Sequence, residues 1–241
     1  MGDIIVTSNM ATDWLQIAAS VEKVEINMCK HDDSLAYCGT AFNLQDERSK
    51  VVASLATALT SFNFIWSAFE ILCKCLPIPP LSKGLKAGRP SFVDQAQYYI
   101  LQEFSSKTNH NVLFYEETLK ALITKVEKLT DHNLEKTFET NPYTSKSGVG
   151  IQIVRAIRNL FAHGAVNPPL PEDHSVDVFI DSQVIELSSR IVLLTIQMLL
   201  LSSCFVPYNS EIGFLEEDYP FYEGTDWSYL YVLPANEQLI S

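Results

Sequence analysis

Residues 52–76 read VASLATALTSFNFIWSAFEILCKCL, and their large apolar side chains recur at alternating steps of three and four. A helix of about 3.6 residues per turn gathers side chains at this spacing into one apolar stripe. We expect the helix to begin near residues 45–49 and to end by Leu76, because three of the next four residues are prolines, which cannot continue a helix. This stretch therefore predicts a long helix with one buried face.

Four further segments carry helical patterns. Apolar stripes of the same spacing run through residues 112–129 and 184–205, and shorter candidates lie at 92–104 and 149–163. Amphipathic helices of this kind bury their stripes against one another. We therefore predict a mainly α protein built on an antiparallel helical bundle over residues 45–206.

The two ends of the chain show other patterns. Residues 1–44 contain Val24-Glu-Ile-Asn-Met28, whose alternation is typical of a strand, so we predict a small β-containing N-terminal extension. Residues 207–241 hold seven acidic and eight aromatic residues and no lysine or arginine. Because aromatic residues favour docking over disorder, we expect an irregular C-terminal extension that packs on another surface.

Composition limits the classes of protein to consider. The chain of 241 residues is 47% hydrophobic and 19% charged, which suffices for a sizeable core, and its net charge of −12 argues against wrapping duplex DNA. The most lipid-like stretch, residues 191–201, is shorter than the roughly 18–20 residues of a membrane span. The first residues lack the basic start of a signal peptide. We expect a cytoplasmic protein that does not contact a membrane.

The cysteines favour the same compartment. There are five, none in a C-x-x-C pair, and an odd number leaves one over in any disulfide scheme, so buried reduced thiols are expected. Cys29, His31 and Cys38 are residue types that bind zinc, but no matching pair follows them. We therefore predict neither a metal nor another cofactor.

Basic residues gather in two stretches that contain no acidic residue, 71–93 and 140–171. In so acidic a chain this clustering indicates a local anion site, although chance placement is an alternative. The residues that we predict to contact an anionic substrate are Lys83, Lys86, Arg89, Lys146 and Arg155.

The second acid-free stretch contains IQIVRAIRNLFAHG at residues 151–164. We expect a helix that Gly164 ends, with Arg158, Asn159 and His163 on its last turn and a half. A histidine there can move a proton near neutrality, and a guanidinium can hold phosphate oxygens, so the group suits phosphoryl transfer. The alternative is structural, because arginine and histidine near a helix C-terminus also cap its carbonyl groups and offset its dipole.

Arg158-Asn159-Leu-Phe-Ala-His163 resembles the R-N-x-x-x-H signature of the HEPN superfamily (higher eukaryotes and prokaryotes nucleotide-binding), in which it ends a bundle helix. Residues 64–72, where an acidic residue follows an aromatic one, are similar to the early long helix of that family. The run that ends at Gly164 before two prolines, and the helix at 189–200, resemble the bacterial HEPN proteins grouped as ApeA-like. The resemblance covers residues 45–206.

The resemblance implies a metal-independent endoribonuclease, of the kind found among toxins and antiviral-defence effectors. Arg158 and His163 would be the catalytic pair and Asn159 would orient them, while the ribose 2′-OH attacks the adjacent phosphate. Family members usually form homodimers in which two such motifs share one cleft. Glu70 would be a partner of Arg158 behind the site, unless it simply faces solvent.

Two questions remain open at this level. The chain could instead be a non-catalytic HEPN module that binds a partner protein or a nucleotide, and an inhibitory or activating protein could control either form. The acidic extension 207–241 could lie near residues 83–89 and restrict access to His163, or it could be an ordinary packed extension with its carboxylates in water.

Overall fold

The computed structural model describes residues 2–30, 39–76, 78, 91–104, 112–129, 147–164 and 179–203. Within these ranges the protein is mainly helical, as predicted. The elements are α1 (Gly2–Ala19), α2 (Gly39–Cys75), α3 (Phe92–Tyr99), the π-helical turn η2 (Ile100–Phe104), α5 (Tyr115–Leu129), α7 (Val149–Ala162) and α8 (Ile180–Ser203). The predicted extension 207–241 lies outside the described residues.

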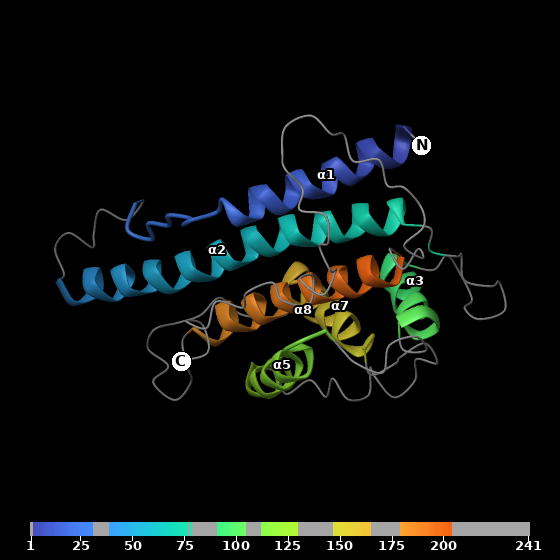
Figure 1. Ribbon diagram of the computed structural model, residues 1–241. Coiled ribbons are helices and arrows are strands. Elements are labelled where there is room, and N and C mark those ends of the chain that lie inside the picture. The colour runs from blue at the N-terminus through green and yellow to red at the C-terminus, as the bar shows by residue number, and fades with distance from the viewer. Residues whose placement is uncertain are drawn as a thin grey trace.

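The long helix α2 is the spine of the structure (Figure 1). Helix α1 packs antiparallel along one side of it, and α8 packs along another side and runs in the same direction as α2. Helices α5 and α7 pack on α8, and α3 contacts both α2 and α7. The side chains of Phe62, Phe69, Ile151, Ile191 and Met198 are almost wholly buried where these helices meet.

The N-terminal region differs from the prediction. No strand occurs among the described residues, and Gly2–Ala19 is a helix that buries Ala11 and Ala18. The segment 21–27 has neither helical nor strand structure and Met28 lies in a turn, so the strand predicted over Val24–Met28 is not formed. Of its alternating apolar residues, Val24 and Ile26 are half-buried and Met28 is exposed, and no neighbouring strand occurs among the described residues.

Two hydrogen bonds fix the segment after α1 onto α2. The backbone N–H of Val24 donates to Thr57 Oγ1 at 2.9 Å, and the N–H of Met28 donates to Ser49 Oγ at 3.0 Å. The four residues from Val24 to Met28 span about 13 Å if extended, and the eight helical residues from Ser49 to Thr57 span about 12 Å. The two rises match, so the segment runs antiparallel to α2 in a defined register.

The first turn of α7 is held by a close contact with α5 and α8. The N–H of Gly150 donates to Tyr115 Oη at 2.9 Å in a buried position. A Cβ atom at Gly150 would lie 2.5 Å from that oxygen and 2.8 Å from Ile191 Cγ2. Only glycine fits here without displacement of its neighbours, and the contact sets where α7 begins.

Two helices, α2 and the Ile180–Leu200 part of α8, are long and apolar enough to cross a membrane by length and composition. The core helices of soluble proteins have the same properties, and 39% and 56% of the two apolar windows are buried inside the fold. Residues 191–201, the apolar run seen in the sequence, are part of the longer helix α8. This finding does not establish a location for the protein.

Candidate functional site

The C-terminus of α7 has the structure that its sequence predicts. The helix ends at Ala162, and Gly164 follows with φ of 65°, a backbone conformation that favours glycine. The N–H of His163 donates to the carbonyl oxygen of Asn159 at 3.0 Å, and the N–H of Gly164 donates to that of Phe161 at 3.2 Å. His163 therefore sits at the C-cap of the helix.

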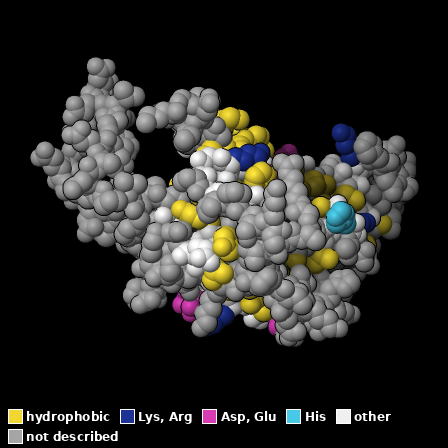
Figure 2. Space-filling model, turned by 90° about the vertical axis from the view of Figure 1, so that its right-hand side faces the viewer, with side chains coloured by type: hydrophobic (Ala, Val, Ile, Leu, Met, Phe, Trp, Pro, Cys, Tyr) yellow, Lys and Arg dark blue, Asp and Glu magenta, His cyan; other side chains and the backbone are white. Residues whose placement is uncertain are grey.

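The imidazole of His163 is accessible. His163 and Asn159, four residues earlier, are both exposed, which agrees with their prediction on one face of the helix. His163 is the one histidine in the described ranges, and Figure 2 shows a histidine side chain at the surface of the molecule. Both residues can reach a ligand in solvent.

The rotation of α7 is fixed by its apolar face. Ile151, Val154 and Ile157 are almost wholly buried, and Phe161 is half-buried against the core. Because this face cannot turn outward without exposing its side chains, the directions of the polar side chains on the helix are also fixed.

Arg158 turns toward α2 and lies on an aromatic ring. Its guanidinium carbon is 5.1 Å from the centre of the Trp66 ring, and the arginine is half-buried there. The indole N–H of Trp66 donates to Glu70 Oε1 at 2.6 Å. Glu70 was predicted as the partner of Arg158, and the structure connects the two residues through the indole. No ion pair between them occurs in the described part of the chain.

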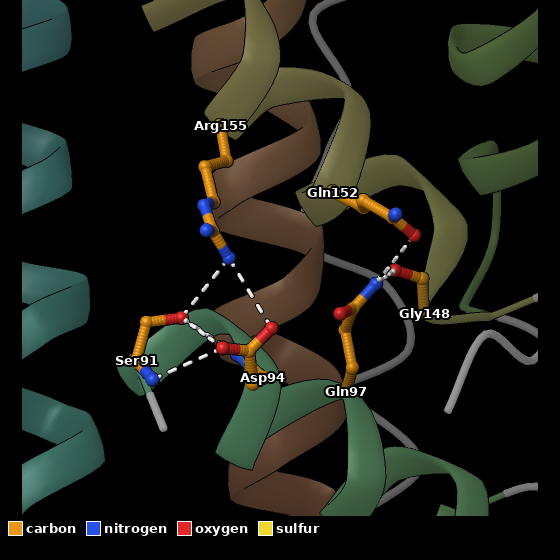
Figure 3. A network of polar contacts seen from close by, with 6 residues as sticks. All are labelled: Ser91, Asp94, Gln97, Gly148, Gln152 and Arg155. Carbon is orange, nitrogen blue, oxygen red and sulfur yellow. Dashed lines mark hydrogen bonds and ion pairs between the residues drawn. The ribbon is translucent and has the colours of Figure 1, made fainter. Parts of the chain in front are cut away.

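Arg155, predicted to bind substrate, is tied to the N-terminus of α3 (Figure 3). Its Nη1 atom lies 3.2 Å from Asp94 Oδ1 and 3.1 Å from Ser91 Oγ. Asp94 is buried, and its Oδ2 atom accepts hydrogen bonds from the backbone N–H and the hydroxyl of Ser91 at 3.0 and 2.7 Å. Arg155 thus joins a capping box of α3 to α7.

A second polar contact between these helices lies deeper (Figure 3). The buried amide of Gln97 donates to the carbonyl oxygen of Gly148 at 3.0 Å and to Gln152 Oε1 at 3.2 Å. Sequence reasoning missed both contacts. The one local signal was the spacing of Ser91 and Asp94 before an apolar run, which is typical of a capping box.

The other predicted site residues cannot be placed. Lys83, Lys86, Arg89 and Lys146 lie outside the described residues, as do His31 and Cys38. Among the described residues no three His, Cys, Asp or Glu side chains form a group that could hold a metal ion.

The described thiols are those of Cys29, Cys73 and Cys75, and none of the three forms a disulfide with another described residue. Burial raises the pKa of the Cys73 thiol, so that thiol stays protonated and unreactive near neutral pH.

The end of α7 thus presents an exposed imidazole and an exposed amide, while the guanidinium of Arg158, from the same stretch of helix, lies half-buried on the Trp66 ring of α2. These are groups that can move a proton and hold an anion. No family model matches the sequence, and no curated protein or solved structure shows significant similarity to the chain.

Proposed function

We propose that this protein is a metal-independent endoribonuclease of the HEPN type, with Arg158 and His163 as its catalytic pair. The single observation that supports this best is the end of α7, where His163 is exposed at the C-cap and Arg158, five residues earlier, is held on the Trp66 ring of α2. The six-residue signature that carries the resemblance is intact, and it lies at the end of a helix, the place that the family's signature has.

The reaction needs two proton transfers and one charge to be stabilised. The ribose 2′-oxygen loses its proton as it attacks the adjacent phosphorus, and the 5′-oxygen gains a proton as it leaves. The products are a 2′,3′-cyclic phosphate and a 5′-hydroxyl. A histidine side chain can carry either proton, while a guanidinium can hold the phosphate oxygens as charge develops on them.

One protomer offers one such histidine in its described part. A homodimer with a two-fold axis near the end of α7 would place two copies of His163 at one phosphate, one as base and one as acid. We therefore propose a composite site between two protomers. A toxin or antiviral effector built this way would act on RNA in the cytoplasm, and a protein partner would restrain or trigger it.

The second candidate is a non-catalytic HEPN module that binds a partner protein or a nucleotide. The observation that favours it is that both arginines near the site have contacts within their own chain, Arg155 with Asp94 and Arg158 with Trp66. In that case the motif would serve to position the helix end rather than to cleave.

Incubation of the purified chain with mixed RNA in EDTA separates the two candidates. The wild type should release fragments with 2′,3′-cyclic phosphate ends, and His163→Ala should lower the rate by about 10²–10⁴-fold, the usual contribution of a general acid or base. Arg158→Ala should also remove most of the activity. Lys128→Ala, which removes an exposed basic side chain from the last turn of α5, is the matched control and should cleave normally.

Two outcomes would contradict the endoribonuclease. One is cleavage that requires Mg²⁺, and the other is cleavage that survives both His163→Ala and Arg158→Ala. Because His163 is exposed, its replacement should leave the melting temperature within a few degrees of the wild type, so lost activity cannot be ascribed to unfolding.

A further inference from the structure

Trp66 is held rigidly in the middle of α2. It is 5% exposed, and its ring centre lies 5.9 Å from that of Phe62 and 5.5 Å from that of Phe69. The hydrogen bond from Nε1 to Glu70, one helical turn further on, prevents the indole from turning over within this packing. One of its faces is therefore presented to α7 in a fixed orientation.

The two arginines of α7 have different environments. Arg155 donates to the carboxylate of Asp94 and the hydroxyl of Ser91, so its charge is offset and some of its donors are occupied. Arg158 lies against a neutral ring, and no described residue accepts a hydrogen bond from it. A cation–π contact holds a guanidinium in place through the ring quadrupole, without an acceptor and without cancelling its charge.

We propose that Trp66 is a positioning residue that holds Arg158 in place with its N–H donors available for a phosphate. This inference rests on the proposed function, since it assigns the phosphate to a strand of RNA. Arg158 itself is the catalytic residue, and Trp66 acts through it. Glu70 completes the arrangement, because its carboxylate fixes the indole and adds negative charge on the side of the ring system that carries the N–H.

The reason for such a support is positional. An arginine side chain has many rotamers, and a guanidinium must meet the phosphate oxygens as the bonds to phosphorus change. A carboxylate partner would restrict the rotamers but would compete with the phosphate for the same donors. An aromatic ring restricts the rotamers of the arginine and does not compete with the phosphate for its N–H donors.

The contact can be tested apart from activity. Replacement of Trp14 and Trp227 by Phe leaves Trp66 as the one tryptophan, so its emission reports the groups beside it. Arg158→Met, which keeps the length of the side chain and removes its charge, should change that emission. Arg190→Met, on the half-buried arginine of α8, is the control and should not. An emission spectrum that Arg158→Met leaves unchanged would overturn the proposal.

The positioning role is tested by RNA cleavage at a temperature at which every variant is folded. Trp66→Leu should lower cleavage by roughly tenfold to a hundredfold, because a misplacement of about 1 Å near the reacting atoms can cost that much. Trp66→Phe, which keeps a π face, should recover part of the loss. Trp14→Leu is the matched control, since Trp14 stacks on Phe64 between α1 and α2, and it should cleave at the wild-type rate.

The outcomes separate this inference from the proposed function. If His163→Ala removes cleavage but Trp66→Leu folds and cleaves like the wild type, the inference is wrong and the endoribonuclease stands. If Trp66→Leu does not fold, Trp66→Phe and Glu70→Leu decide in its place, and wild-type cleavage by both would overturn the inference. If the wild type cleaves no RNA, the proposed function fails, and the emission experiment still decides whether Trp66 holds Arg158.

Discussion

The guanidinium of Arg155 lies 3.2 Å from the carboxylate of Asp94, and this ion pair joins α7 to the first turn of α3. The side chain of Asp94 is 3% exposed and that of Arg155 is 40% exposed, so the pair reaches from the interior to the surface. A carboxylate buried to this extent needs partners for its oxygens, and Ser91 and Arg155 both supply them. The pair thus contributes to the position of the helix that carries the candidate site.

Loss of this contact should weaken the fold. Arg155→Met is expected to lower the free energy of unfolding by about 1–3 kcal/mol, because the buried carboxylate of Asp94 loses its charged partner. Urea unfolding gives the measurement. Lys50→Met is the control, since Lys50 pairs with Asp46 on an exposed face and its removal should leave the stability nearly unchanged. Equal effects of the two substitutions would contradict a structural role for Arg155.

The contact at Gly150 makes a second prediction. Gly150→Ala should destabilise the fold by about 1–3 kcal/mol, because the added methyl group overlaps Tyr115 Oη and Ile191 Cγ2 and the core must shift. At Gly39, the start of α2, an added Cβ meets no atom of the described residues within 4 Å, so Gly39→Ala should be neutral or slightly stabilising. Thermal unfolding of the pair, compared with the wild type, checks this. A Gly150→Ala protein as stable as Gly39→Ala would show that α7 is free to move.

Because the backbone at Gly164 is left-handed, we expect substitutions at this position to destabilise the fold by different amounts. Gly164→Ala should cost about 1–2 kcal/mol, because an alanine at φ of 65° brings its Cβ close to a carbonyl oxygen, although no other atom of the described residues lies within 4 Å of that Cβ. Gly164→Asn should cost less, since asparagine tolerates this conformation better. Denaturant midpoints of the two variants measure the difference, and the reverse order would mean that the turn after α7 changes conformation.

Stability should fall in alkaline solution. Burial raises the pKa of Tyr115 above its ordinary 10.0, and the hydrogen bond from Gly150 opposes this less strongly. Above about pH 10 the unfolded chain therefore releases a proton that the folded chain keeps. The free energy of unfolding then decreases with pH, by up to about 1.4 kcal/mol per pH unit for one such group. Below that range the contribution of Tyr115 does not change.

Burial also raises the pKa of the Cys73 thiol above its ordinary 9.0, so this thiol lowers the stability in alkaline solution as well. The test therefore uses a Cys73→Ala background. Urea unfolding at several values between about pH 8 and 11 should show a smaller decline for Tyr115→Phe than for the parent. A decline of the same steepness in both would mean that the hydroxyl of Tyr115 reaches solvent in the folded protein.

The helices that were predicted are encoded locally, whereas the helix at Gly2–Ala19 was not predicted and α2 begins at Gly39 rather than near residues 45–49. The long helix ends at Cys75, where the sequence predicted an end by Leu76, and the motif helix ends at Ala162 beside its glycine. The large apolar residues were less informative in the first half of α2. There Leu55 and Leu59 are only half-buried, while Ala53 and Ala58 are buried on the side that the segment 21–27 covers. The spacing of large apolar residues identifies a helix, but it does not show where a small residue allows another segment of the chain to approach.

The chemistry of the site was only partly encoded in the motif. The exposure of Asn159 and His163 follows from helix geometry, so the sequence sufficed for it. The partners of Arg155 and Arg158 depend on how α7 is placed against α3 and α2, and that placement joins residues more than 60 positions apart. Arg155 was predicted to bind substrate on charge alone, and charge does not show which basic residue finds a buried carboxylate.

The two hydrogen bonds that fix Val24 and Met28 to α2 have a consequence for how this chain can change in length. An insertion of one residue between them lengthens the extended segment by about 3.3 Å, which corresponds to about two residues along a helix. Neither Thr57 nor Ser49 has a second hydroxyl residue two positions further along on the side that an insertion would require. In evolution, an insertion or deletion in this segment should therefore be retained only when the two hydroxyl residues on α2 also change position.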